Sequence, residues 1–173
     1  MKRYQGLTVL MLMVLVFVVI ESPLFGINGK SNRATLKGVK GVGILVENLS
    51  QEVEREGITK NQLQIELEFK LREAGIKVLT KEECLTVPGE PYLYININLN
   101  TAKTENDVYP YSIDVMFIQK VSLVRDPQQT TYSVTWSTGG VGSISKQLLN
   151  QLRSSVSDIV DIFIQAYLAE NPK

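Results

Sequence analysis

Residues 63–72, LQIELEFKLR, alternate apolar and polar side chains, which is the period of a half-buried strand. The residues on either side of this stretch nevertheless favour a helix. Thr59 lies three residues before Gln62, as in a capping box, and Gly75 follows the stretch where a helix usually ends. We therefore predict a helix over 59–74, and this assignment sets the order of the other elements.

On a helix, the leucines of this stretch form one stripe and Ile65 and Phe69 form a second, narrower one. A second apolar stripe predicts another contact, either with the carboxy-terminal helix or with the loop that follows the next strand. Acid-before-base pairs at i, i+4 stabilise a helix by about 0.2–0.5 kcal/mol each. The two such pairs here are Glu66–Lys70 and Glu68–Arg72.

The remaining elements follow from apolar runs, period-two alternation and one long helical pattern. Strands are predicted over 41–49, 76–79, 92–100, 111–126 and 131–138, and an amphipathic helix over 145–169. The first strand reads as buried on both faces or nearly so, and 81–91 reads as a loop. The order β-α-β-β-β-β-α predicts an α/β (α+β) two-layer sandwich. Its mixed four- to five-stranded sheet would carry both helices on one face.

The amino terminus has the composition of a targeting segment, with Lys2 and Arg3 before an apolar run over 7–20. This run is shorter than the roughly 20 residues that a membrane-spanning helix needs, so a signal peptide is the better interpretation. Gly26 or Gly29 would precede the cut, and an uncleaved anchor is the alternative. The predicted organisation is a leader over 1–26, a flexible linker over 27–40 and one domain over 41–173.

Composition limits the chemistry that this chain can perform. Histidine is absent, so a Ser-His-Asp triad is impossible. Cys84 is the single cysteine, and its neighbours Glu82 and Glu83 would raise its pKa, which predicts an inert thiol. Eighteen basic and eighteen acidic residues cancel, which argues against nucleic acid as a partner. We predict no catalytic residue, cofactor or metal ligand, although a pair of carboxylates stays open as a hydrolytic site.

Two regions are candidates for binding. The first is the segment 136–146, WSTGGVGSISK, a glycine-rich loop that could bind an anion before the last helix; its residues are Gly139, Gly140, Gly142 and Lys146. The favoured alternative is a glycine-rich exit from an edge strand, with Ser143 or Ser145 as the helix cap.

The second region is a solvent-facing side of the sheet that could contact a partner or a glycan; its residues are Tyr92, Tyr94, Asn96, Asn98 and Trp136. Cross-strand pairing within the sheet is the simpler explanation of these aromatic residues.

The segments GVGILVENL, REAGIKVLT and YLYININLN, followed by the closing helix, give an element order that resembles a group of small exported bacterial domains. These are the amino-terminal domain of the translocation protein TolB and the lipoprotein that plugs the outer-membrane lipopolysaccharide transporter. The segments LKGVKGVGILVE, KLREAGIKVLT, PYLYININL and TWSTGGVGS are more similar to uncharacterised bacterial secreted proteins. The resemblance implies a fold and export but names no activity. No cysteine follows the apolar run, unlike in the plug lipoprotein.

We therefore expect a bacterial protein that is exported to the periplasm or secreted, is not an enzyme, and acts through contacts with an unknown envelope protein. Membrane contact would occur only through an uncleaved leader. The alternatives are a histidine-free hydrolase that uses carboxylates, and a carrier of a small ligand or lipid.

Overall fold

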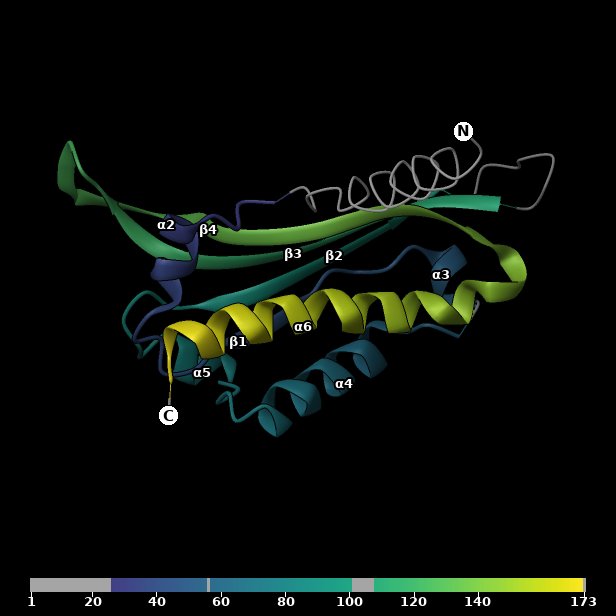
Figure 1. The fold of residues 1–173 in the computed structure, drawn as a ribbon, viewed down its shortest axis with the longest axis horizontal. Helices are drawn as coiled ribbons and strands as arrows, with labels where there is room; N and C mark the ends of the chain where they lie inside the picture. The colour runs from purple at the N-terminus through teal and green to yellow at the C-terminus, as the bar shows by residue number, and fades with distance from the viewer. Residues whose placement is uncertain (1–25, 56, 101–107, 173) are drawn as a thin grey trace, which may run out of the picture.

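The computed structural model describes residues 26–55, 57–100 and 108–172. Its centre is a four-stranded sheet in the order β1-β2-β3-β4, with helices packed on one face (Figure 1). Apart from Gly26, the predicted leader lies outside the described residues. None of the helices in the described ranges is both long and apolar enough to cross a membrane.

The predicted fold class is confirmed. The strands are β1 (Gly43–Val46), β2 (Tyr92–Leu99), β3 (Val108–Leu123) and β4 (Asp126–Ser145). The α-helices are α2 (Lys30–Arg33), α3 (Gln51–Arg55), α4 (Lys60–Glu73), α5 (Lys81–Cys84) and α6 (Leu152–Glu170). Two 3-10 helices, η1 (Ala34–Leu36) and η2 (Lys146–Gln151), follow α2 and precede α6. β1 and β2 are parallel, whereas β3 is antiparallel to both β2 and β4, so the sheet is mixed.

Two predicted strands are shorter than expected. β1 covers only 43–46 of the predicted 41–49, and the expected burial on both faces is not found, because Leu45 is 45% exposed. The predicted strand 76–79 supplies an isolated parallel bridge between Val42 and Val78 and no further pairing. The sheet of the described residues therefore has four strands, and the chain that would have made a fifth leaves the ladder after one position.

The helical assignment of the ambiguous stretch is confirmed by α4. Thr59 accepts a hydrogen bond from the backbone N–H of Gln62 at 3.3 Å, which is half of the expected capping box. The Gln62 side chain accepts from the Thr59 hydroxyl instead of from its backbone N–H. The expected second buried stripe is wrong, because Ile65 and Phe69 point to solvent and are 67% and 60% exposed.

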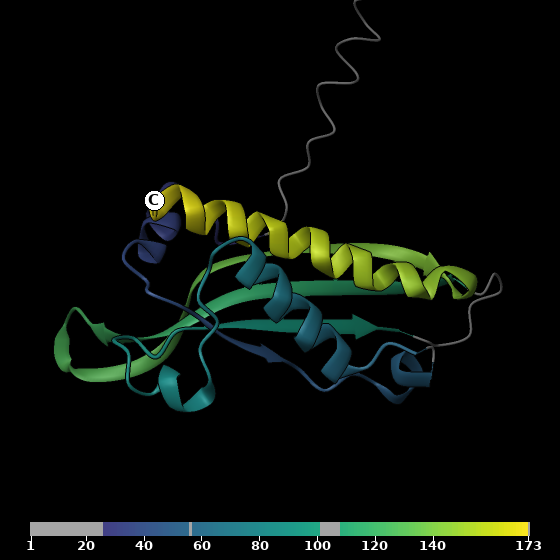
Figure 2. The same ribbon diagram turned by 90° about the horizontal axis from the view of Figure 1, so that it is seen from below.

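α4 and α6 lie on the same face of the sheet, α4 beside β1 and α6 over β3 and β4 (Figure 2). Polar side chains of α4 join the two helices. The ammonium group of Lys70 donates to Ser157 at 2.6 Å and to Asp161 at 2.7 Å, and Glu66 pairs with Arg153. The predicted Glu66–Lys70 pair is therefore replaced by contacts to α6, while Glu68–Arg72 forms as expected at 2.8 Å.

An irregularity in β4 sets which side chains enter the core. Val134 pairs with Ile118 and Trp136 pairs with Phe117, so Thr135 is an extra residue in the strand and the alternation reverses there. Trp136, predicted on the solvent-facing side, is instead fully buried among the core aromatics. Its ring lies edge-on to Phe163 of α6, with ring centroids 5.3 Å apart.

The segment 27–40, expected to be a flexible linker, is folded onto the domain. Leu36 is completely buried in the core, and the backbone of Ile27 pairs with Ser137 of β4. Asn28 accepts a hydrogen bond from the indole N–H of Trp136 at 2.8 Å. The composition predicted a tether because this segment has few apolar residues. Its polar side chains nevertheless form specific hydrogen bonds to β4.

Replacing Asn28 with alanine should lower the free energy of unfolding by about 1–3 kcal/mol, because the buried indole N–H of Trp136 would lose its acceptor. Trp136 is the only tryptophan, so its fluorescence reports both unfolding and the local change. Arg33→Ala is the matched control, since it removes the exposed bond from Arg33 to Asn28 but keeps the acceptor. Equal losses in both variants would contradict the assigned role of Asn28.

Thr138 is buried and its hydroxyl has no hydrogen-bond partner among the described residues. Thr138→Val keeps the shape of the side chain and removes the unpaired hydroxyl, so we expect a gain of about 1 kcal/mol in the free energy of unfolding. Thr135→Val should do the opposite, because the Thr135 hydroxyl accepts from Gln119 at 2.9 Å. Urea denaturation of both variants measures the difference, and a loss of stability in Thr138→Val would overturn the expectation.

Candidate functional site

A groove of about 580 Å³ runs along the outer edge of β1. One wall is the face of α4 that carries Lys60, Gln64 and Glu68, and the opposite wall is the turn of α5. Leu45 and Leu85 also line the groove, and the two side chains are 45% and 64% exposed. The other side chains that line it are Ile44, Leu79, Thr80, Lys81, Cys84, Glu90, Tyr92 and Tyr132, together with Gly43.

The hydrogen bonds of β1 alternate between its two edges. The N–H of Gly43 donates to Pro91 at 3.0 Å and that of Glu47 donates to Ile95 at 2.9 Å, so these positions face β2. Val42 faces the other way, donating to Lys77 and accepting from Leu79, both at 2.9 Å. In a parallel ladder this alternation continues along the strand, so the N–H and C=O of Ile44 point outward to the groove.

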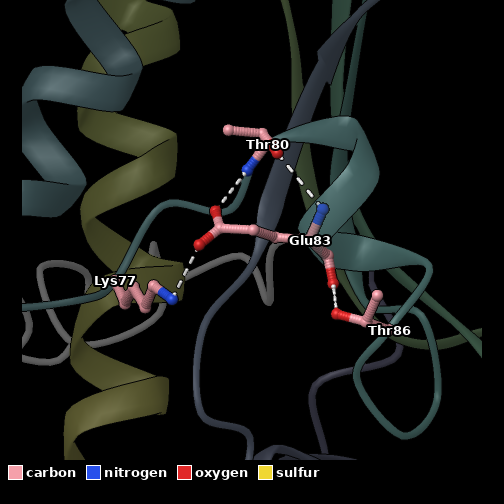
Figure 3. A network of polar contacts seen from close by, with 4 residues as sticks. All are labelled: Lys77, Thr80, Glu83 and Thr86. Atoms are coloured by element: carbon pink, nitrogen blue, oxygen red, sulfur yellow. Dashed lines mark hydrogen bonds and ion pairs between the residues drawn. The ribbon is translucent and has the colours of Figure 1, made fainter.

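The turn of α5 explains why the chain leaves β1 at this point. Thr80 and Glu83 form a complete capping box, with bonds of 2.9 and 3.2 Å between each side chain and the other's backbone N–H (Figure 3). Lys77 pairs with the Glu83 carboxylate at 2.9 Å, and Thr86 donates to the Glu83 carbonyl at 2.8 Å. The backbone bond from Thr80, followed by Lys77, lowers the pKa of Glu83. Helix initiation at Thr80 therefore opens the groove beside Ile44.

The acidic side chains in the groove are already paired. Glu68 bonds to Arg72, and Glu90 accepts from Lys120 at 3.0 Å and from the hydroxyl of Tyr132. The bond from Tyr132 and then that from Lys120 lower the pKa of Glu90, so this carboxyl group is unsuited to act as a general acid near neutral pH.

Cys84 lines the groove beside Gly43, with its thiol 3.6 Å from the Pro91 carbonyl. Burial, above all, raises the pKa of the thiol, and the Glu83 charge raises it further. A thiol with a raised pKa is a poor nucleophile near neutral pH, in line with the inert cysteine expected from sequence. A β-carbon at Gly43 would come within 2.6 Å of the sulfur, so the thiol and the glycine pack closely.

The predicted partner-contact residues do not form one site. Tyr92 lines the groove and lies against Tyr132, with ring centroids 6.3 Å apart. Asn96 and Asn98 line a separate polar hollow of about 520 Å³ at the carboxyl ends of β1 and β2. Tyr94 donates to Glu47, which lines the same polar hollow, and Trp136 belongs to the core.

The segment 136–146 belongs to β4 up to Ser145, which is closer to the favoured alternative of a glycine-rich strand exit than to an anion loop; Ser145 is the N-cap of η2 but its side chain makes no capping bond. Gly139, Gly140 and Gly142 are part of β4 and pair with Asp114, Ile113 and Tyr111, so they do not form a loop before a helix. The small size of Gly139 and Gly142 serves packing, because a β-carbon there would lie 2.5 Å from the Ile113 carbonyl oxygen and within 2.9 Å of the Tyr111 ring, respectively. Lys146 begins η2 at the far end of that strand.

Lys70 and Ser157 are close enough for a serine-lysine pair, but their environment is structural. Lys70 donates to Asp161 as well as to Ser157, and these bonds join α4 to α6. Within the ranges that the structure describes, no three His, Cys, Asp or Glu side chains gather in a way that could hold a metal ion.

Sequence reasoning missed the groove because 81–91 reads as a loop. The signal was present in TKEE at 80–83, where a threonine is followed three residues later by a glutamate. The predicted strand already ends at Leu79, so only the helical turn that starts at Lys81 was missed; with it, β1 would have been expected to have an open edge.

No family model and no curated protein matches this sequence. Among solved structures, a minor lipoprotein from Acinetobacter baumannii aligns at 11% identity and a TM-score of 0.37. The alignment covers 76% of this chain and 92% of that chain. A likeness this weak carries no conclusion about the function of this protein.

The hydrogen bond to Glu47 raises the pKa of Tyr94 from an ordinary 10.0 to about 12. The folded state therefore holds the Tyr94 proton more tightly than the unfolded chain, and this contribution to stability is lost as pH rises from about 10 to 12. Glu47→Gln should bring the pKa back toward 10, as measured by NMR titration of the tyrosine ring. Glu54→Gln, at an exposed acid on α3, should leave the Tyr94 titration unchanged.

Proposed function

We propose that the protein is an exported, non-enzymatic envelope protein that acts through contacts with another protein. The observation that carries this proposal is the concentration of exposed apolar side chains around β1 and α4. Leu45 and Leu85 border the groove, and Ile65 and Phe69 form a ridge on the outer side of α4. Clusters of exposed apolar residues commonly mark sites of protein contact.

The ridge formed by Ile65 and Phe69 has the spacing of a helical binding surface. The two residues are separated by one turn of α4 and lie opposite the buried Leu63, Leu67 and Leu71. The bonds of Lys70 to Ser157 and Asp161 hold the helix on α6, so the ridge is presented on a fixed element. A fixed surface loses less conformational entropy on binding than a mobile one.

The chemistry around the groove favours binding over catalysis. Its two carboxylates are engaged by Arg72 and Lys120, and its thiol has a raised pKa. A two-carboxylate hydrolase would need one protonated and one ionised acid facing a common point. Glu90, with its lowered pKa, does not supply the protonated partner.

In-cell photocrosslinking tests the proposal. A photoreactive phenylalanine analogue at position 69 should give a discrete adduct with an envelope protein, and the adduct should weaken when Ile65 is changed to lysine. The same analogue at Val124, an almost fully exposed residue between β3 and β4, is the control and should give no such adduct. Equal adducts from both positions, or none from position 69, would count against a contact surface on α4.

A carrier of a small ligand or lipid is the second candidate, because a volume of about 580 Å³ falls within the usual range of ligand pockets. A contact protein should show no rise in melting temperature with fatty acids or phospholipids. A concentration-dependent rise that is lost in Leu85→Lys would favour the carrier instead.

A further inference from the structure

We propose that the groove binds an extended, acidic segment of a partner polypeptide, which adds to the outer edge of β1 as a further parallel or antiparallel strand. This inference rests on the proposed function and names the class of partner. It is carried by three observations about the same edge: the direction of its main-chain groups, the ladder that already begins there, and the charges around it.

The outward N–H and C=O of Ile44 can both be satisfied by a ligand whose hydrogen-bond donors and acceptors are spaced as in a β-strand. The neighbouring outward position, Val42, already bonds such a chain, because it contacts the backbone of Lys77 and Leu79. An extended polypeptide meets the same requirement at Ile44, which is the geometry of strand addition to a sheet edge.

The existing ladder also supplies the space. Residues 77–79 run parallel to β1 and turn away at Thr80, where the capping box with Glu83 starts α5. The groove begins where this segment leaves, with Leu79 and Thr80 at one end and Gly43 and Ile44 along its side. Residues 77–79 already pair with the first outward position of this edge, Val42. A bound strand would pair with the next one, Ile44.

The charges in the groove favour an acidic segment. Glu68 and Glu90 are balanced by Arg72 and Lys120, respectively. The ammonium group of Lys60 bonds to the neutral amide of Asn48 at 3.0 Å, and Lys81 is exposed on the opposite wall. The groove therefore presents positive charge from both walls, together with the apolar Leu45 and Leu85. Carboxylates alternating with apolar side chains match this pattern.

Amide hydrogen exchange on the full mature protein tests strand addition. The probe is a capped peptide of eight residues in which valine alternates with aspartate. At saturation, exchange at the Ile44 amide should slow at least tenfold, while that of Leu45, whose amide faces β2, should change less than twofold. The same peptide N-methylated at every residue lacks the donors of a strand and should not slow exchange at Ile44.

Charge reversal tests the acidic preference. The double variant Lys60→Glu, Lys81→Glu should weaken binding of the probe at least tenfold at low salt. Lys37→Glu, Lys146→Glu makes the same change in net charge at exposed positions away from the groove and should stay within twofold. Circular dichroism and Trp136 fluorescence of each variant establish that the fold is retained.

Slower exchange at Ile44 with the probe alone, together with the charge effect, supports strand addition. Unchanged exchange at Ile44, or equal slowing by the methylated peptide, overturns it. Protection of Ile44 without peptide that rises with protein concentration also overturns it, because a second copy would then occupy the edge. If crosslinking at position 69 identifies a partner while Ile44 is unaffected, the proposed function stands and strand addition at β1 does not.

Discussion

The burial of Trp136 is the contact on which the arrangement of the other elements depends. The extra residue Thr135 turns this ring into the core, where it packs against Phe163 of α6. Its indole N–H donates a hydrogen bond to the side-chain oxygen of Asn28. One side chain thereby fixes both the amino-terminal segment and the long helix on β4. α6 in turn holds α4 through Lys70, so the position of the groove wall beside β1 depends on packing near β4, at the opposite edge of the sheet.

The polar contacts between α4 and α6 determine which side chains remain exposed on the outer surface of α4. Glu66 and Lys70 satisfy their charges on α6, so they do not cover the apolar ridge of Ile65 and Phe69. Exposing such side chains offers no stability to the isolated domain, because apolar area stabilises a fold only when it leaves water. Their position on a well-anchored helix is therefore more easily understood through contact with another molecule than through folding.

Local signals in the sequence were sufficient for most of the elements. Thr59 and Gly75 identified α4 against its alternating pattern, and the apolar spacing of 145–169 predicted α6. The errors arose where tertiary pairing decides the result. Parity along β4 placed Trp136 on the wrong face, because the register shift opposite Phe117 depends on the neighbouring strand. For the same reason, the glycines at 139–142 read as a loop although they pair with β3 over their whole length.

The open edge of β1 was not predicted from the sequence, and it is the feature that most needs an explanation. Sheet edges in stable proteins are usually shortened, charged or covered, because exposed main-chain groups invite pairing with other chains. β1 is short, and residues 77–79 cover its first outward position, yet α5 then carries the chain away from Ile44. Continuing the strand past Leu79 would have closed the edge without a new element. The capping box of Thr80 and Glu83 instead stabilises a turn whose effect is to keep the edge accessible, with Lys60 and Lys81 on its two sides.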